Sequence, residues 1–184
     1  MECKILIAGF GGQGMMILGK MLAKAAIIEG KYATFIPSYG AEMRGGTAHC
    51  IVKIADSSIA SPFIDHPDVA IILNQPSLAK FKKNLKKGCI FICNSDLIEN
   101  ELNLQGLKEV KLPLNRIALD CGNLKVANTI VLGLILSLKP GLLKKKTIIK
   151  VLKETFLQKD TLNQNLKALD KGENLCSGKG GKKC

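Results

Sequence analysis

The pattern of hydrophobic and polar residues along the chain predicts strands and helices in alternation. A short apolar run from Lys4 to Ala8 stops at a cluster of glycines, and residues 15–28 then repeat apolar side chains at helical spacing. Further apolar runs predict strands at 32–38, 48–54, 69–73, 89–93 and 110–114. The expected later helices are 78–85, a short helix and turn at 96–105, 115–121, 124–138, 147–157 and 161–175.

This order of elements predicts a single α/β domain over residues 1–176, a three-layer α/β/α Rossmann-like domain with a mixed, mainly parallel sheet. Strands 32–38 and 48–54 are joined without room for a helix, so we expect them to pair antiparallel. Strand 110–114 contains Pro113, which favours an edge position. Helix 124–138 is apolar on nearly all sides and is expected to be deeply buried or to face a partner. Residues 177–184 are mainly glycine and lysine and are predicted to form a disordered basic tail.

The glycine cluster after the first strand is the strongest candidate for chemistry. Gly9, Gly11 and Gly14 fit the pattern G-x-G-x-x-G, and Gly12 adds a fourth glycine beside Gln13. Glycines allow positive φ angles and close approach of a ligand to the backbone, and the following helix start offers free N–H groups to an anion. The alternative is a tight strand-to-helix turn in which glycine serves packing alone.

Standard NAD binding is disfavoured by the positions of the acidic residues along the chain. A dinucleotide site also needs an acidic residue at the end of the second strand, about 20 residues after the glycines. The nearest acids, Glu29 and Glu42, lie before and beyond that strand.

The seven cysteines show no metal-binding spacing, because the chain contains no C-x-x-C pair. Cys89 and Cys93 would share one face of a strand, so we expect free thiols in the core rather than metal ligands or disulfides. The longest apolar stretch, 126–138, is too short to span a bilayer. Together with a start that does not resemble a signal peptide, this predicts a cytoplasmic protein without membrane contact.

The net charge of +12 is unevenly distributed, since residues 139–184 carry +8 of it. A basic surplus raises the possibility of RNA binding. With two tyrosines and no aromatic-rich RNA motif, the chain is not expected to bind nucleic acid.

Three segments of the chain belong together: Gly9-Phe10-Gly11-Gly12-Gln13-Gly14, Pro37-Ser38-Tyr39-Gly40-Ala41-Glu42-Met43-Arg44-Gly45-Gly46-Thr47 and Asn128-Thr129-Ile130-Val131-Leu132-Gly133. In this order they resemble the gamma subunit of 2-oxoacid:ferredoxin oxidoreductases, over about residues 3–175. Residues 38–47 and 68–77 look most like the 2-oxoglutarate type. Ala41 departs from the proline that is usual in this family.

The resemblance implies a complex that oxidatively decarboxylates a 2-oxoacid, forms acyl-CoA from coenzyme A and passes electrons to ferredoxin or a similar acceptor. Thiamine diphosphate, Mg²⁺ and iron–sulfur clusters would lie in alpha, beta and delta subunits, which are the implied partners. This chain lacks the thiamine motif and any cluster-binding pattern, so we expect no catalytic residue, metal or cofactor in it and no activity when isolated. A second copy of the chain, in a homodimer of the isolated subunit, is a further expected partner.

The candidate site joins the glycine cluster to the polar loop after the second strand. Both follow strands that should end at the carboxyl edge of the sheet, where α/β ligands bind. Arg44 could clamp a carboxylate or phosphate, or pair with Glu42 or a partner subunit. Tyr39 could cover a ligand or simply pack. The expected site, for coenzyme A, another anion or a subunit interface, is Gly9, Gly11, Gly12, Gln13, Gly14, Tyr39, Glu42, Arg44, Gly45 and Gly46.

Two further functions remain open from the sequence. One is a stand-alone nucleotide- or anion-binding regulatory module. The other is the gamma subunit of a related branched-chain 2-oxoacid or indolepyruvate oxidoreductase.

Overall fold

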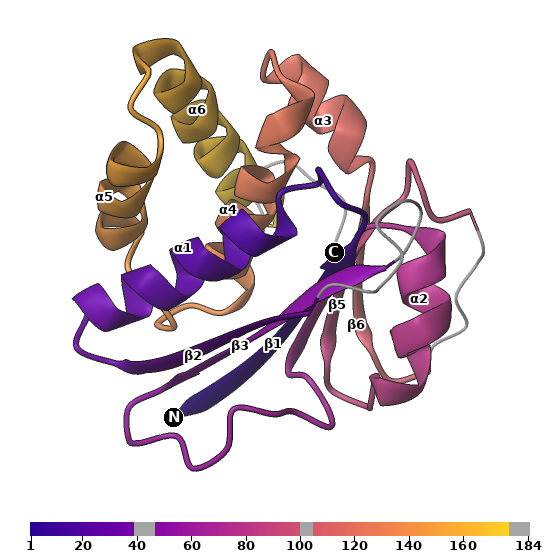
Figure 1. The fold of residues 1–184 in the computed structure, drawn as a ribbon. Helices are drawn as coiled ribbons and strands as arrows, with labels where there is room; N and C mark the ends of the chain where they lie inside the picture. The colour runs from indigo at the N-terminus through magenta and orange to yellow at the C-terminus, as the bar shows by residue number, and fades with distance from the viewer. Residues whose placement is uncertain (39–46, 100–104, 177–184) are drawn as a thin grey trace.

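The computed structural model describes residues 1–38, 47–99 and 105–176, which form one sheet with helices on both of its faces (Figure 1). The elements in chain order are β1 (Glu2–Gly9), α1 (Met15–Ile28), β2 (Tyr32–Ser38), β3 (Ala48–Ala55), β4 (Val69–Ile72), α2 (Gln75–Phe81), the 3₁₀ helix η1 (Lys82–Asn84), β5 (Ile90–Asn94), β6 (Lys108–Leu112), α3 (Leu114–Asp120), the 3₁₀ helix η2 (Leu124–Val126), α4 (Ala127–Leu138), α5 (Lys145–Thr155) and α6 (Lys159–Leu175).

The sheet is mixed and mainly parallel, as predicted. Its strand order is β2-β3-β1-β4-β5-β6, with parallel pairing from β1 through β6 and antiparallel pairing of β3 with both β1 and β2. Because β1 and β2 both run opposite to β3, their carboxyl ends lie at the same edge of the sheet. Gly9 ends β1 opposite Ala48, and Ser38 ends β2 opposite His49.

The helices form two layers of unequal size. Helices α1, α3, α4, α5 and α6 cover one face of the sheet, and α2 lies on the other (Figure 1). The larger core cluster includes Ile7 and Ile71 from the sheet, and a smaller one joins Leu78 of α2 to Phe91 and Cys93 of β5. The predicted three layers are therefore present.

On the second face, the segment that leads to β4 covers the part of β1 and β3 that α2 leaves open. Lys53 of β3 is only 6% exposed, and its Nζ donates a hydrogen bond to the carbonyl oxygen of Ser61 at 2.6 Å. Ile64 and Pro67 of the same segment line a small hollow with Leu6. This segment closes the core where α2 does not reach.

Helix α4 is buried along most of its length, which agrees with its apolar sequence. Every residue from 128 to 135 is buried, because α4 packs against both α6 and the rest of the helical layer. Gly133 and Gly172 allow the backbones of α4 and α6 to touch: a Cβ on Gly133 would collide with the Leu169 carbonyl oxygen and lie 2.7 Å from the Glu173 amide nitrogen. Within the described ranges no single helix is long and apolar enough to cross a membrane, and only the pair α3 and η2–α4, bent by 120°, reaches that length and composition together.

In the described part of the predicted helix and turn at 96–105 there is a turn but no helix. Residues 95–97 form a turn, and residues 100–104 lie outside the described part of the chain. The reason is that Asp96 Oδ2 accepts hydrogen bonds from the backbone N–H groups of Asn115, at 2.9 Å, and Arg116, at 3.1 Å. Its carboxylate therefore serves the start of α3 instead of a local helix.

Several other boundaries differ from the prediction by a few residues. Helix α2 ends at Phe81 and continues as a 3₁₀ turn, and residues 124–126 are 3₁₀ before α4 begins. Leu114 belongs to α3 rather than to the edge strand β6. Helices α5 and α6 each begin two residues earlier than expected. The predicted tail at 177–184 lies outside the described residues.

Candidate functional site

The glycine turn between β1 and α1 uses its glycines in different ways. Gly12 has φ +91° and Gly14, the N-cap of α1, has φ +74°, conformations that other residues rarely adopt. Gly9 is needed for packing, since a Cβ there would collide with Gln13 Oε1 and lie 2.7 Å from Met15 Sδ. Gly11 faces open space, because a Cβ at this position would have no atom of the described residues within 4 Å. Packing therefore accounts for Gly9, and the space beside Gly11 is compatible with a ligand contact, which stays a prediction.

The Gln13 side chain stabilises the turn through hydrogen bonds. Its Oε1 accepts a hydrogen bond from the Phe10 backbone N–H at 2.7 Å, and its Nε2 donates to the Leu73 carbonyl oxygen at 3.4 Å. Asn74, the N-cap of α2, donates to the same Oε1 at 3.4 Å. The side chain thus ties the end of β1 to the end of β4, and only its Nε2 keeps a hydrogen without a partner among the described residues.

Asn128 at the start of α4 holds the other side of the turn, a residue that site prediction from the sequence missed. It is 3% exposed, and its Nδ2 donates a hydrogen bond to the Gly14 carbonyl oxygen at 3.3 Å. Thr129 Oγ1 lies 3.4 Å from Asn128 Oδ1 and donates to Asn165 Oδ1 of α6 at 2.6 Å. The first and third sequence segments that carry the family resemblance therefore meet at Gly14.

The start of α1 is open to an anion. Among the described residues no side chain caps it, and no acidic residue lies in its first turn, so its first N–H groups keep their partial positive charge. A hollow of about 260 Å³, which we call the glycine pocket, lies beside it. It is lined by Gly11, Gly12, Gly14, Met15, Met16, Ile17 and Ala48.

The second half of the predicted site, Tyr39, Glu42, Arg44, Gly45 and Gly46, lies outside the described residues. The residues on either side of that segment do lie at the predicted edge, because Ser38 ends β2 there and Ala48 pairs with Gly9. The combination of this segment with the glycine turn remains a proposal.

A larger hollow, which the sequence did not reveal, lies on the other side of Gly12 at the carboxyl ends of β4 and β5. This leucine pocket has a volume of about 400 Å³. Its apolar walls come from Leu73, Leu97, Leu114, Leu124 and Ala127, and its polar lining comes from Gly12, Gln13, Asn94, Asn115 and Lys125. In the sequence, the signal for this pocket is Asn94, a polar residue that directly follows the predicted buried strand 89–93. No local sequence feature connects Asn94 to Asn115 or Lys125.

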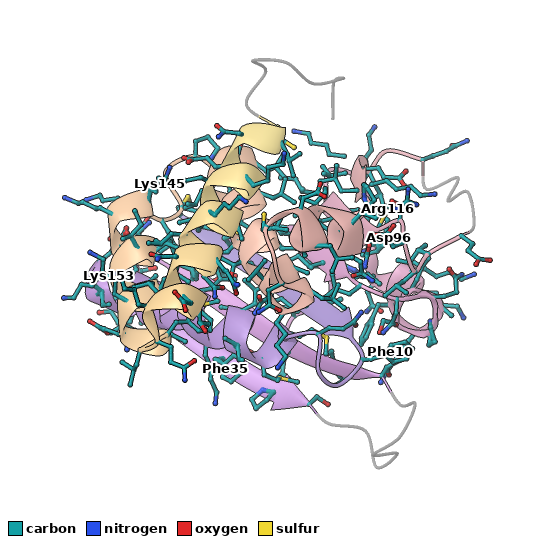
Figure 2. The ribbon with its side chains drawn as sticks, turned by 90° about the horizontal axis from the view of Figure 1, so that it is seen from above. Phe10, Phe35, Asp96, Arg116, Lys145 and Lys153 are labelled. Carbon is teal, nitrogen blue, oxygen red and sulfur yellow. The ribbon has the colours of Figure 1, made fainter. Side chains whose placement is uncertain are left out.

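Asp96 and Arg116 stabilise the wall of the leucine pocket but are not among its lining residues. Arg116 Nε donates to Asp96 Oδ1 at 2.8 Å, and Asp96 is largely buried whereas Arg116 is exposed. Figure 2 shows this pair facing each other on one side of the molecule, with Phe10 of the glycine turn on the same side. Through its bonds to the start of α3, Asp96 holds Asn115 in place beside Asn94.

Cys3, Cys50, Cys89, Cys93 and Cys121 are buried free thiols, which confirms the prediction made for Cys89 and Cys93. Burial raises the pKa of Cys50 and of Cys93 to about 12 and that of Cys3 and of Cys89 to about 11. Cys3 and Cys50 belong to the larger core cluster, and Cys89 and Cys93 to the cluster under α2. In the described part of the chain no three side chains of histidine, cysteine, aspartate or glutamate converge to hold a metal ion.

His49 packs as a structural residue beside the ring of Phe81, with ring centroids 4.8 Å apart. Burial, together with the nearby charge of Lys80, lowers the pKa of His49. Its Nδ1 is buried without a hydrogen-bond partner among the described residues. This setting favours the neutral imidazole in a packed position.

Comparison with known proteins places the chain among oxidoreductase subunits. Residues 4–175 match the family described as Pyruvate ferredoxin/flavodoxin oxidoreductase. Ketoisovalerate oxidoreductase subunit VorA of Methanothermobacter thermautotrophicus is 36% identical over 172 residues, which are 93% of this chain and 36% of that protein. The chain therefore spans about a third of the length of this relative.

Two other similar proteins match this chain over nearly their full length. 2-Oxoglutarate synthase subunit KorC of Methanocaldococcus jannaschii is 33% identical over 175 residues, covering 94% of this chain and 92% of KorC. The crystal structure of a keto/oxoacid ferredoxin oxidoreductase gamma subunit from Geobacter sulfurreducens superimposes with a TM-score of 0.81 at 29% identity, covering 94% of this chain and 96% of that one.

Proposed function

The chain belongs to the Pyruvate ferredoxin/flavodoxin oxidoreductase family, and on this basis we propose that it is the gamma subunit of a 2-oxoacid:ferredoxin oxidoreductase complex. The observation that carries the proposal is the match over residues 4–175 combined with near-complete coverage of relatives that are themselves single subunits. The family resemblance predicted from three sequence segments is thereby confirmed.

The proposed reaction of the complex converts 2-oxoglutarate and coenzyme A to succinyl-CoA and CO₂, with transfer of electrons to ferredoxin or a similar acceptor. Similarity to KorC over nearly the whole of both chains supports this substrate. The second candidate is a branched-chain 2-oxoacid, which is supported by the 36% identity to VorA. Alpha, beta and delta subunits are the proposed partners, and a cytoplasmic location remains a prediction.

Thiamine diphosphate, Mg²⁺ and the iron–sulfur clusters are proposed to lie in the partner subunits, where they would supply decarboxylation and electron transfer. The thiols of this chain support that division. Cys3 and Cys50 lie in one core cluster and Cys89 and Cys93 in the other, on opposite faces of the sheet, and burial raises the pKa of these four thiols, which disfavours the thiolate form that binds iron or zinc. The chain itself is proposed to be inactive when isolated.

The contribution of this chain is proposed to be an anion-binding edge that faces coenzyme A or a partner subunit. Backbone N–H groups at the start of α1 would receive a phosphate or carboxylate, and Gly11 and Gly12 leave space for its approach. Tyr39, Glu42, Arg44, Gly45 and Gly46 are proposed to complete this edge. Gln13 and Asn128 would act as positioning residues, because each fixes the turn through a hydrogen bond to its backbone.

The test is reconstitution with the candidate alpha, beta and delta chains encoded in the same genome. Reduction of a viologen dye is measured with coenzyme A and, in turn, 2-oxoglutarate, 3-methyl-2-oxobutanoate, pyruvate and indolepyruvate. We expect activity only when this chain is present, with the highest kcat/KM for 2-oxoglutarate. Equal activity of the partner chains without it would contradict a gamma-subunit role, and a higher kcat/KM for another 2-oxoacid would assign that substrate instead.

A further inference from the structure

The leucine pocket combines an apolar interior with an unusual balance of polar groups. Five of its lining residues are leucine or alanine, and no acidic side chain is among the described residues that line it. It lies at the carboxyl edge of the sheet, the usual place for ligands in α/β folds. The chemistry of an occupant can be worked out from which polar atoms remain available.

The carboxamide of Asn94 is oriented by three hydrogen bonds within the protein. Its Oδ1 accepts hydrogen bonds from two backbone N–H groups, those of Asp96 at 3.2 Å and Leu114 at 3.1 Å. Since a nitrogen could not accept those bonds, the orientation of the amide is fixed. Its Nδ2 therefore donates to Asn115 Oδ1, at 3.0 Å.

The hydrogen bond from Asn94 determines which polar atom of the Asn115 side chain can bind a ligand. Because its Oδ1 is occupied by Asn94, the side-chain atom left without a partner among the described residues is the donor Nδ2. The Gln13 side chain is arranged in the same way. Its Oε1 accepts a hydrogen bond from the Phe10 backbone N–H, whereas its Nε2 donates one hydrogen to the Leu73 carbonyl oxygen at 3.4 Å and has a second hydrogen available for a ligand. The carboxamide oxygens are thus turned to the protein.

Lys125 supplies a positive charge to the same pocket. It is exposed, and its Nζ has no ion-pair partner within the part of the chain that the structure describes. The carboxylate of Asp96, behind the pocket wall, is engaged by Arg116 and by the start of α3. The pocket therefore offers donors and a cation, and no acidic side chain among its described lining residues competes for them.

We propose that the leucine pocket binds a small amphipathic monocarboxylate, whose aliphatic body contacts the leucines and whose carboxylate faces Lys125 and Asn115. A volume of about 400 Å³ is in the range of small-molecule sites. Burying an aliphatic chain against leucine is favourable by roughly 25 cal/mol per Å². Charge-assisted hydrogen bonds from an ammonium and an amide select a carboxylate over a neutral group of equal shape.

The proposal is independent of the gamma-subunit assignment, because it concerns the full chain on its own. Binding is measured by titration of the isotope-labelled full-length protein, followed by amide NMR shifts, with three probes. The probes are 4-methylpentanoate, its neutral isostere 4-methylpentanamide, and acetate, which has the charge without the aliphatic body. We expect 4-methylpentanoate to bind about tenfold more tightly than the amide and acetate to bind too weakly to saturate. The largest shifts are expected at the residues that line the leucine pocket.

Substitutions separate the two halves of the proposed site. Lys125→Gln should weaken binding of 4-methylpentanoate about three- to tenfold and leave binding of the amide unchanged. Leu124→Ser, at a half-exposed position, should weaken both. The control is Lys153→Gln on α5, an exposed lysine on the opposite side of the molecule from Arg116 (Figure 2), which should change neither.

Three results would overturn the proposal. Equal affinity for the acid and the amide would remove the role of the donors, and equal affinity for acetate would reduce the site to a general anion site. The absence of saturable binding by 4-methylpentanoate to the folded chain would show that the pocket does not take this class of ligand.

Discussion

Asn128 donates a hydrogen bond from its side-chain amide to the backbone carbonyl oxygen of Gly14, over a distance of 3.3 Å and 114 positions in sequence. The same contact leaves no room for a side chain on Gly14, where a Cβ would lie 2.5 Å from Asn128 Nδ2. The start of α4 therefore fixes the conformation of the turn that opens α1. Because Gly14 also has φ +74°, this position is restricted by both space and backbone conformation.

Replacing Gly14 should destabilise the protein, whereas replacing Gly11 should not. We expect Gly14→Ala to lower the free energy of unfolding by about 1–3 kcal/mol, because alanine is strained at positive φ and would displace Asn128. Gly11→Ala is the matched control, since its Cβ would meet open space. The measurement is urea denaturation of both variants and the wild type. Equal destabilisation of the two variants would show that the contact with Asn128 does not determine the turn.

Much of the fold could be predicted because its signals are local. The glycine cluster marks the first turn, and the short connection between β2 and β3 implies their antiparallel pairing, which the structure confirms. The apolar sequence of α4 likewise matches its burial. Helix boundaries were predicted less accurately where contacts with distant residues determine them. The carboxylate of Asp96, for example, accepts a hydrogen bond from the start of α3, and no helix begins at Asp96.

The candidate site was harder to predict because its parts come from distant segments. The sequence indicates that Gln13 lies in the glycine turn, but not that its side chain folds inward to Phe10 and Leu73. The pairing of Asn94 with Asn115 depends on the order of β5, β6 and α3 in space, and no spacing rule brings Lys125 to the same pocket. Such contacts follow from packing and not from periodicity.

The buried thiols should make stability depend on alkaline pH. Cys50 has its pKa raised from 9.0 to about 12 by burial, so the folded chain holds this proton at pH values where the unfolded chain releases it. Its contribution to stability is intact below pH 9 and is lost progressively as the pH rises from 9 toward about 12.

Cys50→Ala tests this by removing the thiol. The variant should be less stable at neutral pH because a cavity replaces the sulfur, but its free energy of unfolding should fall less steeply above pH 9 than that of the wild type, so that the two values converge. Comparing the two proteins cancels the shared titration of the lysines. Parallel curves for the two proteins would refute a raised pKa at this thiol.

Arg44→Ala should affect the assembled complex and leave the isolated chain folded. If Arg44 pairs with a phosphate of coenzyme A or a partner carboxylate, its loss would cost about 1.5–3 kcal/mol, or about tenfold or more in affinity. The measurements are the KM for coenzyme A and the yield of copurified partner subunits, with Lys153→Ala as the control for lost charge. No change in either quantity would remove Arg44 from the site.

The role of this chain inside a 2-oxoacid oxidoreductase can be tested by purifying the tagged chain from its native cells and measuring 2-oxoacid-dependent viologen reduction in the eluate. We expect catalytic subunits to copurify and the eluate to reduce the dye only when a 2-oxoacid and coenzyme A are both present. A folded chain that elutes alone, from cells whose remaining extract retains all of this activity, would contradict this role.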